Sequence, residues 1–444
     1  HSPNIEAFAK RTGIRTIRPA FPAVTCTAQS DYVTGKTASG HGIVSNGWYN
    51  HELAEVQFWK QSNHVVQAPK IWDELKARNP GFTCAKVFWW YNMYASVDYS
   101  ITPRPMYPAD GRKFFDVYAN PFSIRTEIKK ELGEFPFPGF WGPAAGVKSP
   151  QGPRDSASRW IAESAKWIEN KYQPTLSLVY IPHLDYNFQR FGPNDERVTR
   201  DIEQVDAIVG DLLTFFEGRG IKPILLSEYG ITPVNQAIHI NRILREQGWL
   251  TIKEELGLEL LDAGASEAFA VADHQVAHIY VKNEGLRSAV QKVLERVPGI
   301  DAVFGYEEKA AYGIVHERAG DLIAVAKENA WFTYYYWNDD SKAPDFARCV
   351  DIHRKPGYDP VELFLDPAIP LVKAKIAFCL LKKKLGFRML MDVIPLDASL
   401  VKGSHGCRPS DQKDWPILIC DQPGATLEST EVYNVIRAAV LNGE

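Results

Sequence analysis

The amino-acid sequence predicts an α/β fold built on a doubly wound, mostly parallel sheet. Two observations support this fold class. Short runs that are apolar on both faces, as in a sheet covered on both sides, alternate with longer runs of helical periodicity. Turn residues bound the apolar runs, which is typical of buried strands. The expected strands are residues 85–91, 176–181, 223–227, 277–281 and 416–420.

The runs between these strands have the periodicity of amphipathic helices. Residues 156–172 place Trp160, Ile161 and Trp167 on one stripe, because residues three, four and seven positions apart share a helix face. Residues 197–218 repeat the pattern. Strands that alternate with such helices indicate the doubly wound arrangement.

Two regions interrupt the alternation and predict insertions over the sheet. Both are rich in Pro, Gly and aromatic residues, which favours loops that cap a site. The 12 Trp, 19 Tyr and 22 Phe residues fit either a core of large side chains or an aromatic pocket. The predicted organisation is core 1–102, cap 103–153, core 154–329, cap 330–370 and core 371–444.

Composition narrows the class of protein. The 444 residues are 45% hydrophobic and 23% charged, with a net charge of -4, which is ordinary for a globular protein with a sizeable core. The chain has no excess of basic residues that would indicate a nucleic-acid polymer as partner. We also identify no Lys/Arg cluster that would suggest an anionic membrane surface. No apolar run reaches about 18 residues, so no membrane span is expected. The sequence does not indicate the oligomeric state.

The six cysteines are scattered, and none forms a CxxC pair. This usage favours reduced, buried thiols over a disulfide framework. Because the first residues do not have the pattern of a signal peptide, a cytoplasmic location is expected.

Residues 21–49 carry the first candidate chemistry. An apolar approach leads to Thr25, in a turn rich in hydroxyl and amide side chains that precedes an expected helix. A helix N-terminus offers free N–H groups and a partial positive charge, which suit a phosphate. Thr25 is therefore a candidate nucleophile toward phosphorus. A structural N-cap is the alternative role.

The same segment resembles a known family. The motifs are FPAVT at 21–25, Thr-Gly at 34–35 and HGIVSNGWY at 41–49. Together they are similar to the nucleophile region of the nucleotide pyrophosphatase/phosphodiesterases, a family of the alkaline phosphatase superfamily. The resemblance implies an alkaline-phosphatase-like core and metal-dependent phosphoryl chemistry.

The resemblance assigns roles to individual residues of this segment. Thr25 takes the place of the family's metal-bound nucleophile, and Asn46 matches the family's Asn after HGIV and is a candidate substrate contact. The family's phosphate-binding Asn falls on Ala28, which is a departure. The adjacent Gln29 is the candidate substitute in substrate binding.

Three later stretches match the family's metal-ligand positions. HLDYNFQRFGP places Asp185 and Gln189 four residues apart, on one face of a helical turn. SEYG contributes Glu228 and Tyr229, and GSHG contributes His405. Gln189 and Tyr229 stand where the family has His, and Gln is a weak ligand for zinc.

The resemblance implies one or two bound divalent ions. Zn²⁺ and Mn²⁺ are the leading candidates, and because the ligand set is rich in oxygen, Mg²⁺ is a further candidate. Thr25 would itself contact an ion. The family's remaining ligand, an Asp at the end of the first strand, has no counterpart in this sequence, and we expect that strand to precede His1.

Other residues are candidates for additional metal ligands or substrate contacts in this site. His183 lies two residues before Asp185, so both point to one side if the segment is extended. In the segment 351–359, His353 is a candidate ligand, and Lys355 and Tyr358 are candidate substrate contacts. A structural role is the alternative for His183 and His353. Two histidines that flank an expected strand are assigned structural roles: His274 and His278.

The predicted function is metal-dependent hydrolysis of a phosphodiester or pyrophosphate bond in a small-molecule phosphate ester or nucleotide. Thr25 would form a covalent phospho- or nucleotidyl-enzyme that water then hydrolyses. One alternative, motivated by Gln189, Tyr229 and Ala28, is a family member that binds a phosphorylated ligand without hydrolysing it. Another is a phosphonate hydrolase or phosphotransferase on the same fold.

Overall fold

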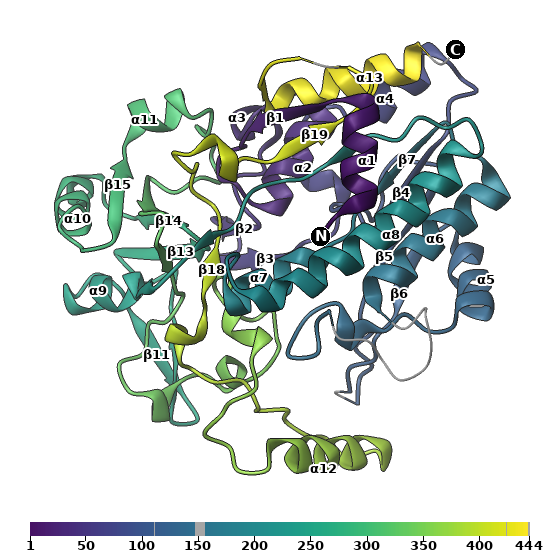
Figure 1. Ribbon diagram of the computed structural model, residues 1–444. Coiled ribbons are helices and arrows are strands. Elements are labelled where there is room, and N and C mark those ends of the chain that lie inside the picture. Colours follow the sequence, from purple (N-terminus) through teal and green to yellow (C-terminus); the bar gives the residue numbers. More distant parts are fainter. Residues whose placement is uncertain (111, 147–155, 423, 443–444) are drawn as a thin grey trace.

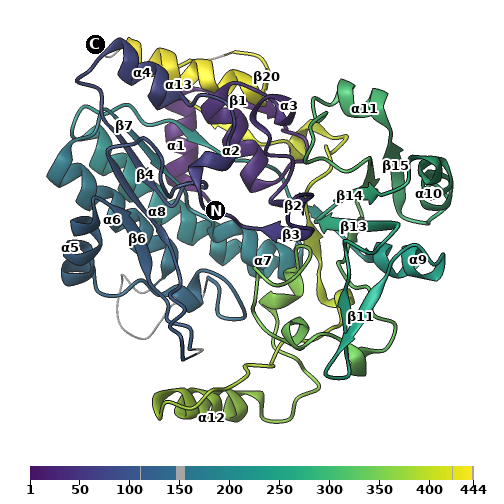
Figure 2. The same cartoon turned by 180° about the vertical axis from the view of Figure 1, so that it is seen from behind.

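The computed structural model describes residues 1–444 except 111, 147–155, 423 and 443–444. In the described residues, helices flank three four-stranded sheets, which confirms the predicted α/β class. Two of these sheets lie in one half of the molecule and the third lies in the other half (Figure 1). Figure 2 shows the same two halves from behind.

The first sheet has the order β6 (Val117–Asn120), β5 (Tyr99–Pro103), β4 (Cys84–Val87) and β7 (Leu176–Val179). β4 pairs in parallel with both β5 and β7, and β6 joins the edge antiparallel. The strands predicted at 85–91 and 176–181 are therefore present as β4 and β7. The first ends early, because the chain turns at Phe88, which has a φ of 61°.

Helices cover both faces of this sheet, as Figure 1 shows. One face carries α5 (Phe122–Leu132), α6 (Ala157–Tyr172) and α8 (Thr199–Glu217), and the other carries α2 (Thr25–Thr34), α4 (Ile71–Arg78) and α13 (Val432–Leu441). The helices predicted at 156–172 and 197–218 are present as α6 and α8. Ala85 and Val87 pack with α5 and α6, whereas Cys84 packs with α4 and α13. This double coverage explains why β4 is apolar on both faces.

The second sheet has the order β20 (Leu427–Glu428), β1 (Ile14–Arg18), β19 (Ile417–Ile419) and β8 (Leu225–Leu226). β8 and β19 are the strands predicted at 223–227 and 416–420. β19 runs antiparallel to both β1 and β8. The mostly parallel arrangement thus holds among β4, β5 and β7 but not here. The whole third sheet separates β8 from β19 along the chain, so no single crossover helix imposes a parallel direction.

The third sheet has the order β13 (Ala268–Asp273), β14 (Val276–Val281), β16 (Leu322–Ala326) and β15 (Ile300–Phe304), with every pairing antiparallel. β14 contains the strand predicted at 277–281. A tight turn joins β13 to β14, and His274 in that turn has a φ of 60°. Around the sheet lie α9 (Ile240–Glu246), α10 (Arg287–Leu294) and α11 (Tyr306–Ala311).

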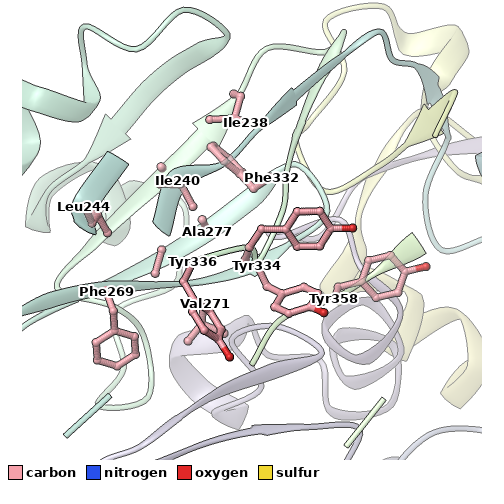
Figure 3. Close-up of a cluster of buried hydrophobic side chains, with 14 of the residues drawn as sticks. Ile238, Ile240, Leu244, Phe269, Val271, Ala277, Phe332, Tyr334, Tyr336 and Tyr358 are labelled. Atoms are coloured by element: carbon pink, nitrogen blue, oxygen red, sulfur yellow. The ribbon is translucent and has the colours of Figure 1, made fainter. Parts of the chain in front are cut away.

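The largest hydrophobic core lies against this third sheet. Figure 3 shows Phe332, Tyr334, Tyr336 and Tyr358 packed among aliphatic residues of the sheet and of α9. The aromatic run of the second predicted cap is therefore part of the core. The first predicted cap, 103–153, of which residues 111 and 147–153 lie outside the described part of the chain, supplies β6 and α5. Its residues 106–110 and 112–115 form two exposed arms that are joined by a bridge between Met106 and Phe114.

The remaining named helices and strands are α1 (Pro3–Thr12), α3 (Ala38–His41), α7 (His183–Phe191), α12 (Val372–Lys384), β2 (Gly47–Asn50), β3 (Glu55–Phe58), β9 (Thr232–Pro233), β10 (Gln236–Ile238), β11 (Ile252–Glu255), β12 (Leu258–Leu261), β17 (Ala330–Phe332) and β18 (Gly403–Ser404). All six cysteines are free and buried. Within the described residues, no helix combines the length and the apolar character that crossing a membrane requires.

Candidate active site

Thr25 is the first residue of α2 and is only 4% exposed. The N-cap residue Val24 has no side-chain acceptor, so it does not cap the N–H groups of the first turn. Asn46 provides one acceptor, because its Oδ1 lies 3.0 Å from the N–H of Cys26. The Thr25 hydroxyl thus stands at the positive end of a helix, where an anion is favoured.

Glu228 and Tyr229, which follow β8 in the chain, face this hydroxyl. The Oγ1 of Thr25 lies 3.0 Å from the hydroxyl of Tyr229, and Thr25 also favours the charged form of the Glu228 carboxyl. Gln29 holds Glu228 from one turn further along α2, since its Nε2 donates to Glu228 Oε1. The Oε1 of Gln29 accepts the N–H of Trp90 at 2.7 Å. Both ends of the Gln29 amide are therefore engaged, and Gln29 positions Glu228.

A second carboxyl, Asp185 in the first turn of α7, lies close by. Burial raises the pKa of Asp185 to about 6 and that of Glu228 to about 8. The two carboxylates also repel each other, which adds to the rise at Glu228. Gln189, one turn after Asp185, exchanges hydrogen bonds of 2.9 and 3.0 Å with the hydroxyl of Tyr358.

Two histidines approach Asp185 with their ring orientations fixed. His405 Nδ1 lies 2.7 Å from the carbonyl oxygen of Ala23, and its Nε2 lies 3.6 Å from Asp185 Oδ1. His274 Nδ1 lies 2.6 Å from Asp273 Oδ1. A carbonyl and a carboxylate only accept, so Nδ1 is the donor in each ring and Nε2 is the nitrogen left without a partner. Burial lowers the pKa of His405 well below its ordinary value, which keeps this ring neutral.

These rings form a column of four, drawn from four separate segments of the chain. Tyr229 stacks on His405 with centroids 3.6 Å apart and an interplanar angle of 7°. His405 lies 3.8 Å from His274, and His274 lies 3.6 Å from Tyr358. The stacking holds both imidazoles between phenol rings and restricts their rotation.

The site contains buried polar atoms that lack partners. Asp185 Oδ1, His274 Nε2 and His405 Nε2 are buried without a hydrogen bond. One carboxylate oxygen and two imidazole nitrogens are the donor set that Zn²⁺ and similar divalent ions prefer. In the described part of the chain, no three His, Cys, Asp or Glu side chains already surround a common ion position. The donor chemistry therefore fits one divalent ion, for which the side chains would close in.

The second ion implied by the family resemblance fits less well. The hydroxyls of Thr25 and Tyr229 are hydrogen-bonded to each other, and Glu228 accepts a hydrogen bond from Gln29. Burial also raises the pKa of Tyr229 well above its ordinary value, so this phenol keeps its proton. Gln189 is engaged with Tyr358. These predicted ligands thus form a hydrogen-bonded group beside Asp185 and His405.

The structure does not bring the two additional predicted histidine ligands to this group. His183 uses both ring nitrogens elsewhere, with Nδ1 3.1 Å from Ser158 Oγ and Nε2 2.9 Å from Gln204 Oε1. It lies on the first turn of a helix, where the alternation of a strand does not apply. His353 Nδ1 lies 3.3 Å from the carbonyl oxygen of Phe58. Both histidines therefore have structural contacts.

Of the two predicted substrate contacts near residue 355, the structure places one in the site. Tyr358 ends the ring column. Lys355 is instead buried in an ion-pair cluster, with Nζ 2.7 Å from Asp359 Oδ2 and 2.8 Å from Glu362 Oε1. Because both carboxylates already pair with its ammonium group, Lys355 is not available to bind a substrate phosphate.

His274 is the site residue that sequence reasoning missed, because it was assigned a structural role. The available signal was the polar triplet Asp273-His274-Gln275 between two apolar strands. His278 does have the structural role expected of it: its Nε2 lies 3.1 Å from the Val44 carbonyl oxygen, and its Nδ1 accepts the N–H of Gly320 at 3.1 Å.

Comparison with known proteins places these features in context. A family model described as type I phosphodiesterase / nucleotide pyrophosphatase matches residues 1–359. An uncharacterized pyrophosphatase/phosphodiesterase from Schizosaccharomyces pombe is 22% identical over 239 residues, which is 53% of this chain and 41% of that protein. The matched region thus spans less than half the length of this relative.

Solved structures share the fold. Human ectonucleotide pyrophosphatase / phosphodiesterase 5 superposes with a TM-score of 0.57 at 16% identity, over 99% of this chain and 90% of the other. An inactive variant of the murine protein, in complex with AMP, gives 0.54 at 16% identity with the same coverage. Phosphonoacetate hydrolase from Sinorhizobium meliloti 1021, in complex with phosphonoformate, gives 0.56 at 13% identity, again over 99% and 90%.

Proposed function

Because the chain belongs to the type I phosphodiesterase / nucleotide pyrophosphatase family, we propose that it is a metal-dependent phosphohydrolase with Thr25 as its nucleophile. Its substrate would be a small-molecule phosphodiester or pyrophosphate. The observation that carries the proposal is the buried Thr25 hydroxyl, which stands at the N-terminus of α2, 3.0 Å from the Tyr229 hydroxyl and close enough to Glu228 to favour its charged form. No other hydroxyl is needed to account for the chemistry.

The proposed reaction has two steps. Thr25 Oγ1 attacks phosphorus, its proton passes to the Glu228 carboxylate, and the bond from phosphorus to the leaving oxygen breaks. Water then cleaves the resulting bond between phosphorus and Thr25 and regenerates the hydroxyl. The positive end of α2 stabilises the charge that builds on the phosphoryl oxygens. Tyr229, which keeps its proton, donates a hydrogen bond to the same region.

We propose that Asp185, His405 and His274 hold a single divalent ion. When bound, the ion supplies Lewis-acid stabilisation of phosphoryl charge. His274 takes the imidazole role that Gln189 and Tyr229 do not fill. The Nδ1 contacts to Ala23 and Asp273 resemble the outer-shell bonds that orient metal-bound histidines.

Two single substitutions in α2 test the nucleophile. Thr25→Ala should reduce hydrolysis of bis-p-nitrophenyl phosphate by about 1,000-fold or more. Thr34→Ala is the matched control, because Thr34 ends the same helix and its hydroxyl donates to the Ser30 carbonyl at 2.7 Å. Intact-mass measurement after acid quench should detect a phosphoryl adduct on the wild type and not on Thr25→Ala. Equal activity of both variants would exclude Thr25 as the nucleophile.

Metal content tests the ion site independently of turnover. Binding of Zn²⁺ and Mn²⁺ should be measured by calorimetry on the metal-stripped protein. His274→Ala and His405→Ala should weaken binding at least about 100-fold, whereas His183→Ala should not. If the wild type binds no ion and turns over neither phosphodiester nor phosphonoacetate with any ion, the chain binds a phosphorylated ligand without hydrolysing it.

A further inference from the structure

Helix α12 stands away from the rest of the molecule (Figures 1 and 2). Apart from Cys379, every residue of α12 is exposed or only partly buried. The helix and the turn that follows it nevertheless carry large apolar side chains in water. Seven of them lie in residues 371–390: Leu371, Phe378, Leu380, Leu381, Leu385, Phe387 and Leu390.

The two exposed arms formed by residues 106–110 and 112–115 continue the same surface. Lys383 Nζ lies 5.9 and 5.4 Å from the ring centroids of Phe114 and Phe115, and Arg388 Nε donates to the Asp110 carbonyl oxygen at 3.0 Å. The arms add four exposed apolar side chains, which are Met106, Tyr107, Phe114 and Phe115. We call residues 106–110, 112–115 and 371–390 together the α12 surface.

Exposed apolar residues are concentrated here beyond chance. The described residues include seventeen exposed large hydrophobic side chains, of which seven lie in 371–390 and four in 106–115. Scattered exposed apolar residues need no explanation, but a contiguous group of this kind marks an interaction surface.

The charge of the α12 surface identifies the kind of partner. Residues 371–390 contain six Lys or Arg and no Asp or Glu, although the whole chain has a net charge of -4. In the part of the chain that the structure describes, Lys382, Lys383 and Lys384 pair with no carboxylate. Partial burial and repulsion from Lys113 lower the pKa of Lys383. An anionic partner would relieve this repulsion.

We propose that the α12 surface docks on an anionic lipid surface. The lysines would meet headgroup phosphates and carboxylates, while Phe378, Leu381 and their neighbours enter the boundary between headgroups and acyl chains. A nucleic acid would not account for the exposed leucines and phenylalanines. From the sequence we identified no Lys/Arg cluster that would suggest an anionic membrane surface, and the proposal departs from that expectation. The three lysines Lys382, Lys383 and Lys384 indicate a membrane-binding surface only because the fold leaves the apolar side chains beside them exposed.

The orientation follows from where the surface lies. Helix α12 lies at the opposite end of the molecule from α2, which begins with Thr25 (Figures 1 and 2), so docking would leave the candidate active site free. Charge and apolar contact both contribute, and salt should weaken the charge contribution because surface attraction decays within a Debye length.

Vesicle co-sedimentation of the full chain tests the proposal. Binding should occur to phosphatidylcholine vesicles containing 30% phosphatidylserine and not to phosphatidylcholine alone, and it should weaken in high salt. The charge-reversal variant Lys382→Glu/Lys383→Glu/Lys384→Glu should weaken binding about 100-fold or more, at roughly fivefold for each lysine lost. The apolar variant Phe378→Ser/Leu381→Ser should also bind more weakly, with bis-p-nitrophenyl phosphate hydrolysis unchanged in both.

A matched control has the same charge change elsewhere. Lys10→Glu/Lys222→Glu/Lys292→Glu alters three exposed lysines outside the α12 surface and should bind like the wild type. Equal loss in the control and the α12 variant would overturn the proposal, because net charge alone would then explain binding. So would a lack of binding to both vesicle types. So would a stable dimer that the apolar variant dissociates and that binds no vesicle, because a second copy would then cover the surface.

Discussion

Asp273→Asn is the substitution that most directly tests how the site is held together. Asp273 is fully buried and accepts four hydrogen bonds. The donors are Ser45 Oγ at 2.6 Å, the N–H of Asn46 at 2.8 Å, Asn46 Nδ2 at 3.2 Å and His274 Nδ1 at 2.6 Å. Burial alone would raise the pKa of this carboxyl, but these bonds hold it below its ordinary value.

The size of the effect follows from this count. An asparagine has the same shape but only one acceptor oxygen, so it can retain at most two of the four bonds, and its amide N–H groups face other donors. Bonds to a charged group contribute about 1.5–3 kcal/mol each, so losing two should cost about 3–6 kcal/mol of unfolding free energy. Because domains are stable by only about 5–15 kcal/mol, this is a large fraction of the total. His274 should also lose its fixed orientation, which would weaken metal binding about 10- to 100-fold.

Urea unfolding and metal calorimetry measure the two effects separately. The control is Asp321→Asn, since Asp321 accepts the N–H of Val281 at 2.8 Å on the same sheet but is not bonded to His274. An unchanged urea midpoint in Asp273→Asn would refute the four-bond account. A lowered midpoint with unchanged metal affinity would show that His274 does not hold the ion.

Three further outcomes are expected. Acid should destabilise the protein through His278, because burial lowers the pKa of this ring to about 4. The contribution of the neutral ring to the unfolding free energy is complete above about pH 6.5 and declines by about 3 kcal/mol toward pH 4. His278→Gln should flatten that decline when urea unfolding is measured across this pH range. Lys355→Met should cost about 3–5 kcal/mol in the same assay, because two buried carboxylates lose their counter-ion, and an unchanged midpoint would contradict the buried pairing. Gly230→Ala should cost about 3 kcal/mol and reduce hydrolysis, because an added Cβ would lie 1.9 Å from the Asp414 carbonyl oxygen; full activity would show that the loop after Tyr229 moves freely.

The sequence predicted the parts of the site that depend on short motifs in a fixed order. Thr25, Glu228, Tyr229, Asp185 and His405 each follow a strand or open a helix, and the fold brings them together. Their roles in catalysis and metal binding stay predictions. The α/β class was also accessible, because apolar runs of strand length alternated with helical periodicity.

Other features depend on tertiary contacts that periodicity does not encode. His274 reaches the site because a two-residue turn reverses the chain between buried strands, and the same sequence would serve in a purely structural turn. The aromatic run 331–337 satisfies the composition of a cap and of a core equally, and the structure places it in the core. The direction of β19 depends on the strands beside it, β1 near the start of the chain and β8 near its middle.

The ring column has a consequence for how the protein matures. Tyr229, His274, Tyr358 and His405 are contributed by segments far apart in the chain, and His405 is anchored on Ala23. Contacts of such high sequence separation form late, because closing long loops costs entropy before the contacts reward it. During synthesis the column cannot close until the residues around 405 have left the ribosome. The ion-binding imidazoles should therefore stay apart in the nascent chain, and activity should appear only once both ends of the chain have met.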